Sequence, residues 1–187
     1  MKRDTIIQAG WPAPLWLTFM LGASLTFSVG FACAAPLAAL AALAALTLDR
    51  KHAILFTGVV WLANQACGYS LLHYPVTANS LAWGAALGLA AIAATLAARA
   101  AAARLAGRSR LLAVGAAFLA AFAAYEGLQY CVALFALGGT EAYSLPVLAR
   151  EVELNAIAMA GLIALTYAGA VVRARSAAGS LQSGIRN

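Results

Sequence analysis

Charged residues are scarce in this sequence. Only 10% of the 187 residues are Asp, Glu, Lys or Arg, and 64% are hydrophobic, whereas roughly 25% of an average soluble domain is charged. This balance excludes an ordinary soluble domain and predicts an all-α integral membrane protein. A chain of this length accommodates about six spans of ~20 residues with short loops, which leaves no room for a separate soluble domain.

The sequence motifs of familiar enzymes are also missing. No P-loop, HExxH, GxSxG or kinase-type set of residues is found, so we do not expect the chain to be an enzyme or to hydrolyse ATP by itself. We also expect no cofactor. The histidines, His52 and His73, fall at the two ends of one predicted helix, ~32 Å apart at 1.5 Å per residue, which excludes a bis-histidine haem. Two-histidine and multi-carboxylate metal spacings are absent, and we expect no metal site.

Cysteine is rare, and basic residues do not form a stripe. Cys33, Cys67 and Cys131 lie within apolar segments without CxxC spacing, which is typical of small buried hydrophobic residues. The net charge of +6 comes from arginines at the ends of apolar segments, where they act as orientation signals. Without basic residues interleaved with aromatics, we expect no nucleic-acid partner.

Six apolar stretches remain, and they predict one six-helix transmembrane domain over residues 1–175. The expected spans are about 14–35, 36–48, 53–74, 79–98, 111–137 and 152–172. The chain after Arg173 is rich in Ser, Gly and Arg, and we expect residues 176–187 to form a mobile cytoplasmic tail. For the first stretch a cleaved signal peptide is the alternative, because Ala32, Cys33 and Ala34 resemble a cleavage site. Its apolar run, however, exceeds the usual core of 7 to 15 residues.

The second stretch decides the topology. Residues 36–48 would form a helix of only ~20 Å, which is shorter than the ~30 Å hydrocarbon core. If it crosses, with both termini cytoplasmic, eleven of the twelve basic residues are cytoplasmic, as the positive-inside rule requires. If it is re-entrant, nine of the twelve are outside. We therefore expect it to cross, with local thinning of the bilayer or burial behind neighbouring helices, in a multi-pass protein of a bacterial-type inner membrane.

One carboxylate, Glu126, lies in the middle of the apolar stretch 111–137. An acidic residue at the centre of a span costs about 2.5 to 3.5 kcal/mol, so such residues usually face a protein interior or a watery cavity. Gln129 and Tyr130 follow at i+3 and i+4 and share its helical face. We interpret this face as the wall of a pocket. The structural alternative is a protonated Glu126 that is hydrogen-bonded inside the bundle.

The six-span topology collects acidic, aromatic and amide side chains toward the outer side. Part of this asymmetry mirrors the positive-inside rule. Asn64 and Gln65 fall near the midplane, where they are either interhelical hydrogen-bonding groups or ligand contacts. The carboxylates of Glu126, Glu151 and Glu153 lie toward this outer side, as does Tyr143 of the outer loop. Together they favour a cationic heterocycle as ligand. The predicted ligand-binding residues are Glu126, Gln129, Tyr130, Glu153, Asn155, His73, Asn79, Trp83 and Gln65.

Small residues recur on two predicted helices and would allow close approach of another backbone. Gly22, Thr26 and Gly30 form such a face on the first stretch, and we predict it as a partner interface, with packing inside the subunit as the alternative. Gly84 and Gly88 form a GxxxG face on the fourth stretch.

The six-span topology, the short Ala/Leu-rich second helix with its basic turn (LDRKH, residues 48–52) and the polar outer mouth together resemble a known family. They are similar to the substrate-binding S components of energy-coupling-factor vitamin transporters. The resemblance covers the whole chain as topology and includes no specific motif. It implies a vitamin-like solute bound from the outer side and a transmembrane coupling subunit with ATPases. That subunit would dock on the ladder from Gly22 to Ala32, which departs from the Ala-xxx-Ala form typical of the family.

Two other functions remain open from the sequence. One is a structural or assembly subunit of a larger membrane complex. The other is a membrane-embedded enzyme that uses Glu126 or His73 as an acid or base, which requires the two side chains to converge.

Overall fold

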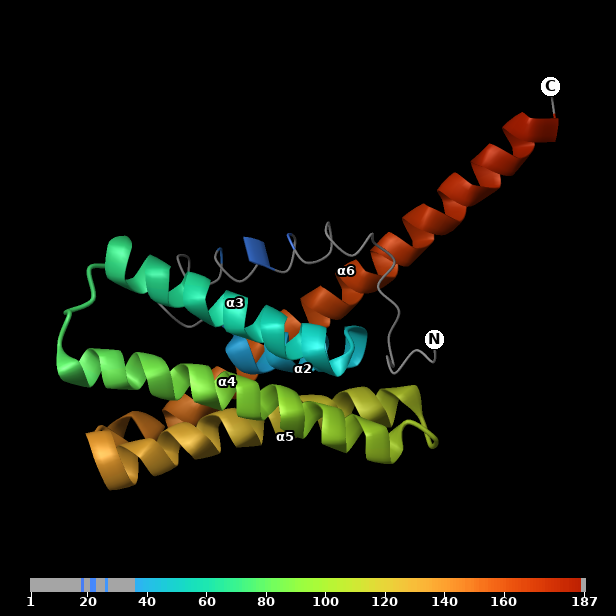
Figure 1. The fold of residues 1–187 in the computed structure, drawn as a ribbon. Coiled ribbons are helices and arrows are strands. Elements are labelled where there is room, and N and C mark those ends of the chain that lie inside the picture. The colour runs from blue at the N-terminus through green and yellow to red at the C-terminus, as the bar shows by residue number, and fades with distance from the viewer. Residues whose placement is uncertain (1–17, 19–20, 23–25, 27–35, 186–187) are drawn as a thin grey trace.

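Helices make up the regular structure of the described chain, which comprises Thr18, Leu21, Gly22, Thr26 and residues 36–185 of the computed structural model. A π-helical turn, Ala133–Leu137, extends α5, and a 3₁₀ turn, Thr140–Tyr143, leads to α6. The described residues include no strand, so the all-α class is confirmed for them. Figure 1 shows α3, α4 and α5 running alternately back and forth, with α6 extending beyond them. The helices are α2 (Leu37–Thr47), α3 (Arg50–Ser70), α4 (Ala78–Leu105), α5 (Arg110–Val132) and α6 (Leu145–Ile185).

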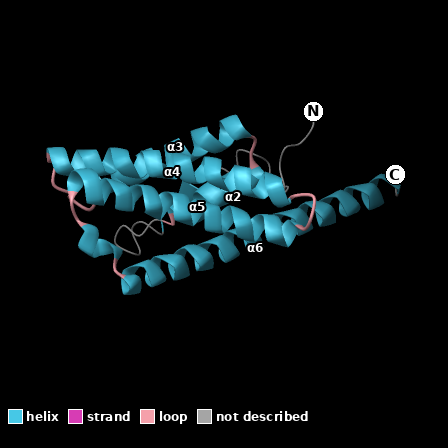
Figure 2. Ribbon diagram, turned by 90° about the horizontal axis from the view of Figure 1, so that it is seen from below, coloured by secondary structure: helices cyan, strands magenta, loops and turns pink. Residues whose placement is uncertain are grey.

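The short helix α2 is the core of the bundle. All of its residues are buried, and it contacts α3, α4, α5 and α6, so that it lies between the longer helices in Figure 2. Its sequence, LAALAALAALT, is apolar on every side, which is the pattern of a helix that is buried all round. A helix of 11 residues is only ~16 Å long, so α2 extends through about half of a hydrocarbon core of ~30 Å.

Side chains from two neighbouring helices hold the ends of α2. The Asn155 Oδ1 atom on α6 accepts a hydrogen bond of 3.1 Å from the backbone N–H of Ala39. At the other end, Arg99 Nη1 on α4 donates to the carbonyl oxygens of Ala45 (3.2 Å) and Leu48 (2.8 Å). Helix ends leave backbone groups without intrahelical partners, and a cation is favourable at a helix C-terminus. These two side chains therefore satisfy backbone groups that would otherwise be buried without partners.

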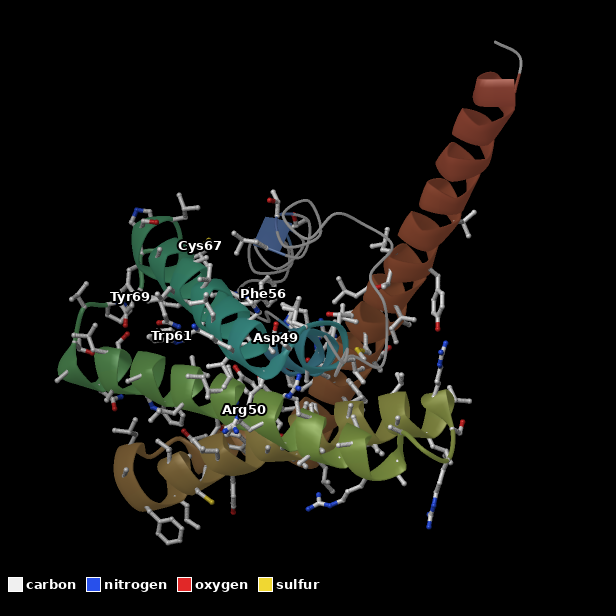
Figure 3. The ribbon with its side chains drawn as sticks, turned by 45° about the vertical axis from the view of Figure 1, so that its right-hand side comes forward. Asp49, Arg50, Phe56, Trp61, Cys67 and Tyr69 are labelled. Atoms are coloured by element: carbon white, nitrogen blue, oxygen red, sulfur yellow. The ribbon has the colours of Figure 1, made fainter. Side chains whose placement is uncertain are left out.

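The two glycines of the GxxxG face on α4 accommodate side chains of α3. Trp61 Nε1 donates a hydrogen bond of 2.8 Å to the Gly84 carbonyl, and Figure 3 shows Trp61 and Tyr69 between the two helices. A Cβ atom at Gly84 would lie 2.7 Å from Gln65 Oε1, and one at Gly88 would lie 2.7 Å from the Trp61 ring. The small residues thus make room for large α3 side chains.

Three described helical segments are long and apolar enough to cross a membrane: Ala78–Leu105, Arg110–Leu137 and Leu145–Gly169. Large apolar side chains point outward from them, with Leu89 at 63%, Leu119 at 65% and Ile157 at 58% exposed. In water such a surface would be unfavourable, so these helices indicate a membrane protein. The predicted first span, 14–35, lies outside the described residues apart from Thr18, Leu21, Gly22 and Thr26. Helix α3 is less apolar because Asn64 and Gln65 lie in its second half.

The helix boundaries agree with the predicted spans to within one residue for α2 and for α5 with its π-helical turn. They differ by three residues or more at both ends of α3, at the C-terminal end of α4 and at both ends of α6. Helix α6 begins at Leu145 instead of near residue 152, because a proline in the first helical turn, here Pro146, forfeits no intrahelical hydrogen bond. It continues to Ile185, past residue 172 and through most of the predicted tail. Helix α3 begins at Arg50, where the Asp49 side chain accepts a hydrogen bond of 3.1 Å from the backbone N–H of His52. This bond lowers the pKa of Asp49.

Candidate functional site

A polar cavity of about 260 Å³ lies next to the N-terminus of α2. Residues from α2, α3, α4, α5, α6 and the 3₁₀ turn contribute to its wall, so segments far apart in the sequence meet there. Of the residues predicted to bind a ligand, Glu126, Gln129 and Gln65 line it. Among the described residues, the lining consists of Leu37, Asn64, Gln65, Leu72, Tyr74, Leu87, Tyr125, Glu126, Gln129, Ala142, Tyr143, Val147 and Glu151.

Two carboxylates from different helices share this cavity. Glu126 on α5 and Glu151 on α6 both line it, and both are half-buried. Among the described residues the only ion pair joins Asp49 and His52, so neither cavity carboxylate is paired with a basic side chain there. Carboxylates in a partly buried apolar setting are costly without a partner. The pair therefore makes the cavity attractive for a cation or a strong hydrogen-bond donor.

One buried polar group on the α5 wall of the cavity, the Tyr125 hydroxyl, has no hydrogen-bond partner among the described residues. Tyr125 and Gln129 are each only 8% exposed. The Gln129 Nε2 atom donates to the backbone carbonyl of Tyr125 (3.2 Å). The Tyr125 hydroxyl forms no hydrogen bond with any residue that the structure describes. Since buried polar groups are nearly always hydrogen-bonded, this hydroxyl is available to a molecule in the cavity.

The first turn of α2 reaches the same cavity through Leu37. The residue before the helix, Pro36, supplies no side-chain cap, and the N–H of Ala39 is the one that Asn155 caps. Within the described part of the chain, the N–H groups of Leu37 and Ala38 have no acceptor, and both residues are buried. The N-terminus of a helix also carries a partial positive charge.

Tyr143, in the 3₁₀ turn, also lines the cavity. Burial and the negative charge of Glu126 raise the pKa of its hydroxyl to about 12, so Tyr143 remains a neutral hydrogen-bond donor and acceptor near pH 7. Tyr130 does not line the cavity and is 43% exposed, but its ring packs edge-on against the Tyr143 ring with centroids 5.4 Å apart. The structure thus places Tyr143 on the wall, and not the predicted contact Tyr130.

The remaining predicted ligand-binding residues are not in the cavity wall. Glu153, His73 and Asn79 are exposed, and Trp83 is half-buried. His73 lies in the turn after α3 with a positive φ of 56°, and no hydrogen bond or ion pair joins it to Glu126. Asn155 is buried and holds α2 in place, and ligand contact stays a prediction for these residues.

Several wall residues were not among the predicted ligand contacts, most notably Tyr125, Tyr74 and Leu37. A sequence signal existed for Tyr125, because it lies four residues before Gln129 and hence on the same helical face. No local sequence pattern indicates that Leu37 lines the cavity, because its place in the wall depends on where α2 begins inside the bundle.

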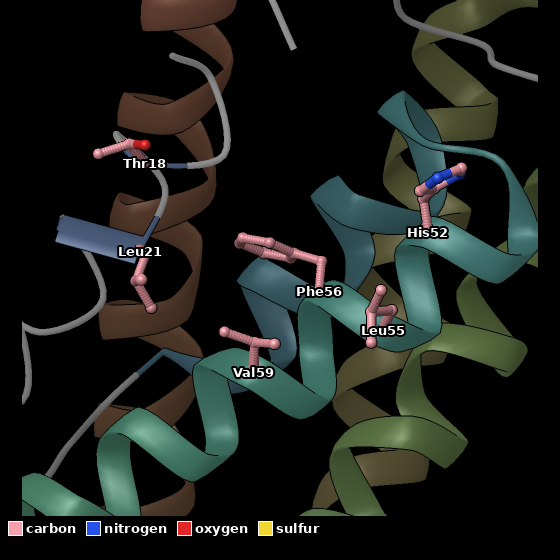
Figure 4. A pocket seen from close by; sticks show the side chains of 6 residues that line it. All are labelled: Thr18, Leu21, His52, Leu55, Phe56 and Val59. Atoms are coloured by element: carbon pink, nitrogen blue, oxygen red, sulfur yellow. The ribbon is translucent and has the colours of Figure 1, made fainter. Parts of the chain in front are cut away.

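The predicted partner face on the first stretch is described only in part. Gly22 and Thr26 are exposed. The Thr26 hydroxyl donates a hydrogen bond of 2.9 Å to the Gly22 carbonyl. A Cβ atom at Gly22 would meet nothing within 4 Å. Gly30 lies outside the described residues. An apolar cavity of about 240 Å³ separates this segment from α3 (Figure 4), lined by Thr18, Leu21, His52, Leu55, Phe56 and Val59.

The described residues include no group of three or more His, Cys, Asp or Glu side chains placed to hold a metal ion. No protein-family model, curated protein or solved structure matches the chain. The chemistry of the polar cavity is therefore the basis for a functional assignment.

Proposed function

We propose that this chain is a multi-pass protein of a bacterial-type inner membrane that binds a small solute for uptake. The solute carries a cationic or strongly donating group and occupies the polar cavity. The observation that carries this proposal is the pair of half-buried carboxylates, Glu126 and Glu151, which face one cavity without a basic partner among the described residues. Because buried carboxylates need a partner, a positively charged solute would stabilise both.

The dimensions and the wall of the cavity favour a compact, ring-containing solute. A volume of about 260 Å³ lies at the lower end of the ~300–1,000 Å³ range of typical ligand pockets. Tyr125 and Tyr143 line the cavity, and an aromatic ring attracts a cation electrostatically. A vitamin-like cationic heterocycle meets these requirements.

The proposed topology has six spans with both termini in the cytoplasm. It rests on the basic residues, of which eleven of twelve are then cytoplasmic. The 3₁₀ turn with Tyr143 and the ends of α3 and α5 then lie toward the outer side, so that the cavity receives its solute from outside the cell. By its resemblance to the S components of energy-coupling-factor transporters, the protein would pair with a transmembrane coupling subunit and ATPases through the face around Gly22, Thr26 and Gly30.

The proposal is tested by replacing one carboxylate with its neutral isostere. Glu126→Gln keeps the size and hydrogen-bonding ability of the side chain and removes its charge. We expect the affinity for thiamine or another cationic heterocycle to fall by about 1 to 3 kcal/mol, the value of a charged hydrogen bond, which is roughly 5- to 150-fold in Kd. Folding should be preserved, because a neutral amide is cheaper to bury than a carboxylate. Calorimetry and thermal unfolding of the purified protein in detergent measure both.

Glu141→Gln is the matched control, because Glu141 is exposed in the 3₁₀ turn and does not line the cavity. It removes the same charge and should leave binding unchanged. A Glu126→Gln variant that binds every cation as tightly as the wild type, but melts at a lower temperature, would assign Glu126 a structural role and overturn the proposal.

A further inference from the structure

Helix α2 begins inside the bundle rather than at one end of it. Its first residue, Leu37, lines the polar cavity together with residues from the middle of longer helices, such as Leu87 on α4 and Tyr125 on α5. Its third residue, Ala39, is capped by Asn155, eleven residues into α6. The partial positive charge of a helix N-terminus is thus directed into the interior, next to the cavity.

Hydrogen-bond donors without described acceptors gather at this point. They are the N–H groups of Leu37 and Ala38, which are both buried at the start of α2, and the hydroxyl of Tyr125, a residue that is 8% exposed and lines the cavity together with Leu37. A buried donor without an acceptor is unfavourable. Neither Glu126 nor Glu151 satisfies them, because no hydrogen bond joins either carboxylate to these donors. An anionic group in the cavity would be an acceptor for the Tyr125 hydroxyl and would lie next to the first turn of α2.

The cavity therefore contains both hydrogen-bond donors and carboxylates that have no described partner. Its donor side, formed by the first turn of α2 and Tyr125, suits a carboxylate or similar anion. Its acceptor side, formed by Glu126 and Glu151, suits a cation. A simple cation would leave the donors unpaired, and a simple anion would be repelled by the two carboxylates. A molecule with both charges would match both sides at once.

We propose that the solute is amphoteric. It has an anionic group that binds at the N-terminus of α2 and the Tyr125 hydroxyl, and a cationic group that binds at Glu126 and Glu151. This inference rests on the proposed function and narrows its solute from cations in general to small zwitterions of the amino-acid or betaine type, including heterocyclic ones.

Pairs of probes that differ only by a carboxylate test the inference. L-histidine is compared with histamine, and L-lysine with cadaverine, by calorimetry on the purified full-length protein in detergent at neutral pH. Within at least one pair we expect the amino acid to bind about tenfold or more tightly than the amine, since a charge-assisted hydrogen bond contributes ~1.5 to 3 kcal/mol. The comparison is made within the wild type, so it does not depend on a variant that folds.

Tyr125→Phe then assigns the anion site. The substitution removes only a hydroxyl that has no described partner, so folding should be retained, and the advantage of the amino acid over its amine should shrink about fivefold or more. The matched control is Tyr167→Phe, since Tyr167 is 57% exposed on α6 and should not change the ratio.

The outcomes separate the inference from the proposed function. If amines bind as tightly as amino acids and both weaken in Glu126→Gln, the cation site stands and the amphoteric solute is rejected. The same rejection follows if the advantage of the amino acid is unchanged in Tyr125→Phe. If neither member of any pair binds, and the cationic heterocycles also fail to bind in a Glu126-dependent way, the proposed function itself is wrong.

Discussion

Asn155 uses both ends of its side-chain amide within the fold. Oδ1 accepts from the Ala39 N–H at 3.1 Å, and Nδ2 donates to the Glu151 carbonyl at 3.0 Å. The residue is only 3% exposed. It therefore connects the first turn of α2 with the segment of α6 that carries Glu151, and it helps to position one carboxylate of the cavity relative to the helix N-terminus.

Removing this amide should destabilise the protein. In Asn155→Ala the Ala39 N–H loses its acceptor while it stays buried, and we expect a loss of about 1 to 3 kcal/mol in the free energy of unfolding. Asn155→Asp keeps an acceptor oxygen for Ala39 and should retain more of the stability. Thermal unfolding in detergent provides the measurement.

Asn79→Ala is the comparison for this prediction, because Asn79 is exposed near the start of α4. A surface substitution of this kind changes stability by about 0.5 kcal/mol or less. Equal losses for Asn155→Ala and Asn79→Ala would contradict the capping role.

At the scale of elements, the pairing of α3 with α4 depends on which glycines face a side chain. A Cβ atom at Gly88 would lie 2.7 to 3.0 Å from three atoms of the Trp61 ring, and Trp61 is held in place by its hydrogen bond to Gly84. Gly115 on α5 is different, because an added Cβ would meet nothing within 4 Å. The same substitution should therefore have opposite effects at these two positions.

Gly88→Ala should lower stability by about 1 to 3 kcal/mol, the usual cost of overpacking. Gly115→Ala should be neutral or raise stability by up to about 1 kcal/mol, because alanine favours the helix. Thermal unfolding of both variants against the wild type tests this. If the two variants melt at the same temperature, the α3–α4 contact does not require glycine at position 88.

Helix α2 is the element around which the longer helices pack. It contacts four helices and is held at its C-terminal end by Arg99 and at its N-terminal end by Asn155. A short helix of this kind leaves room inside the bundle beyond its first residue, and that room is the polar cavity. The cavity thus follows from the length of α2 as much as from the polar residues around it.

For the whole molecule, the orientation in the membrane is the next quantity to measure. Thr77 precedes α4 and Gly107 follows it, so the two positions lie at opposite ends of one long helix (Figure 1). The distribution of basic residues predicts that Gly107 and Ser180 are cytoplasmic and that Thr77 and Thr140 are external.

Single introduced cysteines test this orientation. The native cysteines Cys33, Cys67 and Cys131 are first replaced by serine. One cysteine is then introduced at a time, by Gly107→Cys, Ser180→Cys, Thr77→Cys or Thr140→Cys. A membrane-impermeant thiol reagent applied to intact cells should modify only positions 77 and 140. Modification of position 107 from outside would overturn the six-span topology, because a re-entrant second segment reverses every later helix.

The sequence by itself determined the features that depend on local composition. Apolar runs bounded by polar residues predicted a helix at the place of each of α2, α3, α4, α5 and α6, because a backbone in an apolar environment must form its hydrogen bonds within the segment. The depth of Glu126 in its run, and the position of Gln129 one turn later, indicated a polar wall. Both side chains do line the cavity.

Only the tertiary structure decided what these helices place together. The bond between Asn155 and Ala39 joins residues 116 apart in the sequence, and the cavity combines Leu37 with Glu151, which are also far apart in the sequence. The function of Gly84 and Gly88 as space for Gln65 and Trp61 likewise required the packing of α3. Helical periodicity shows which residues share a face of one helix, but the neighbour of that face is set by long-range packing, which no local pattern encodes.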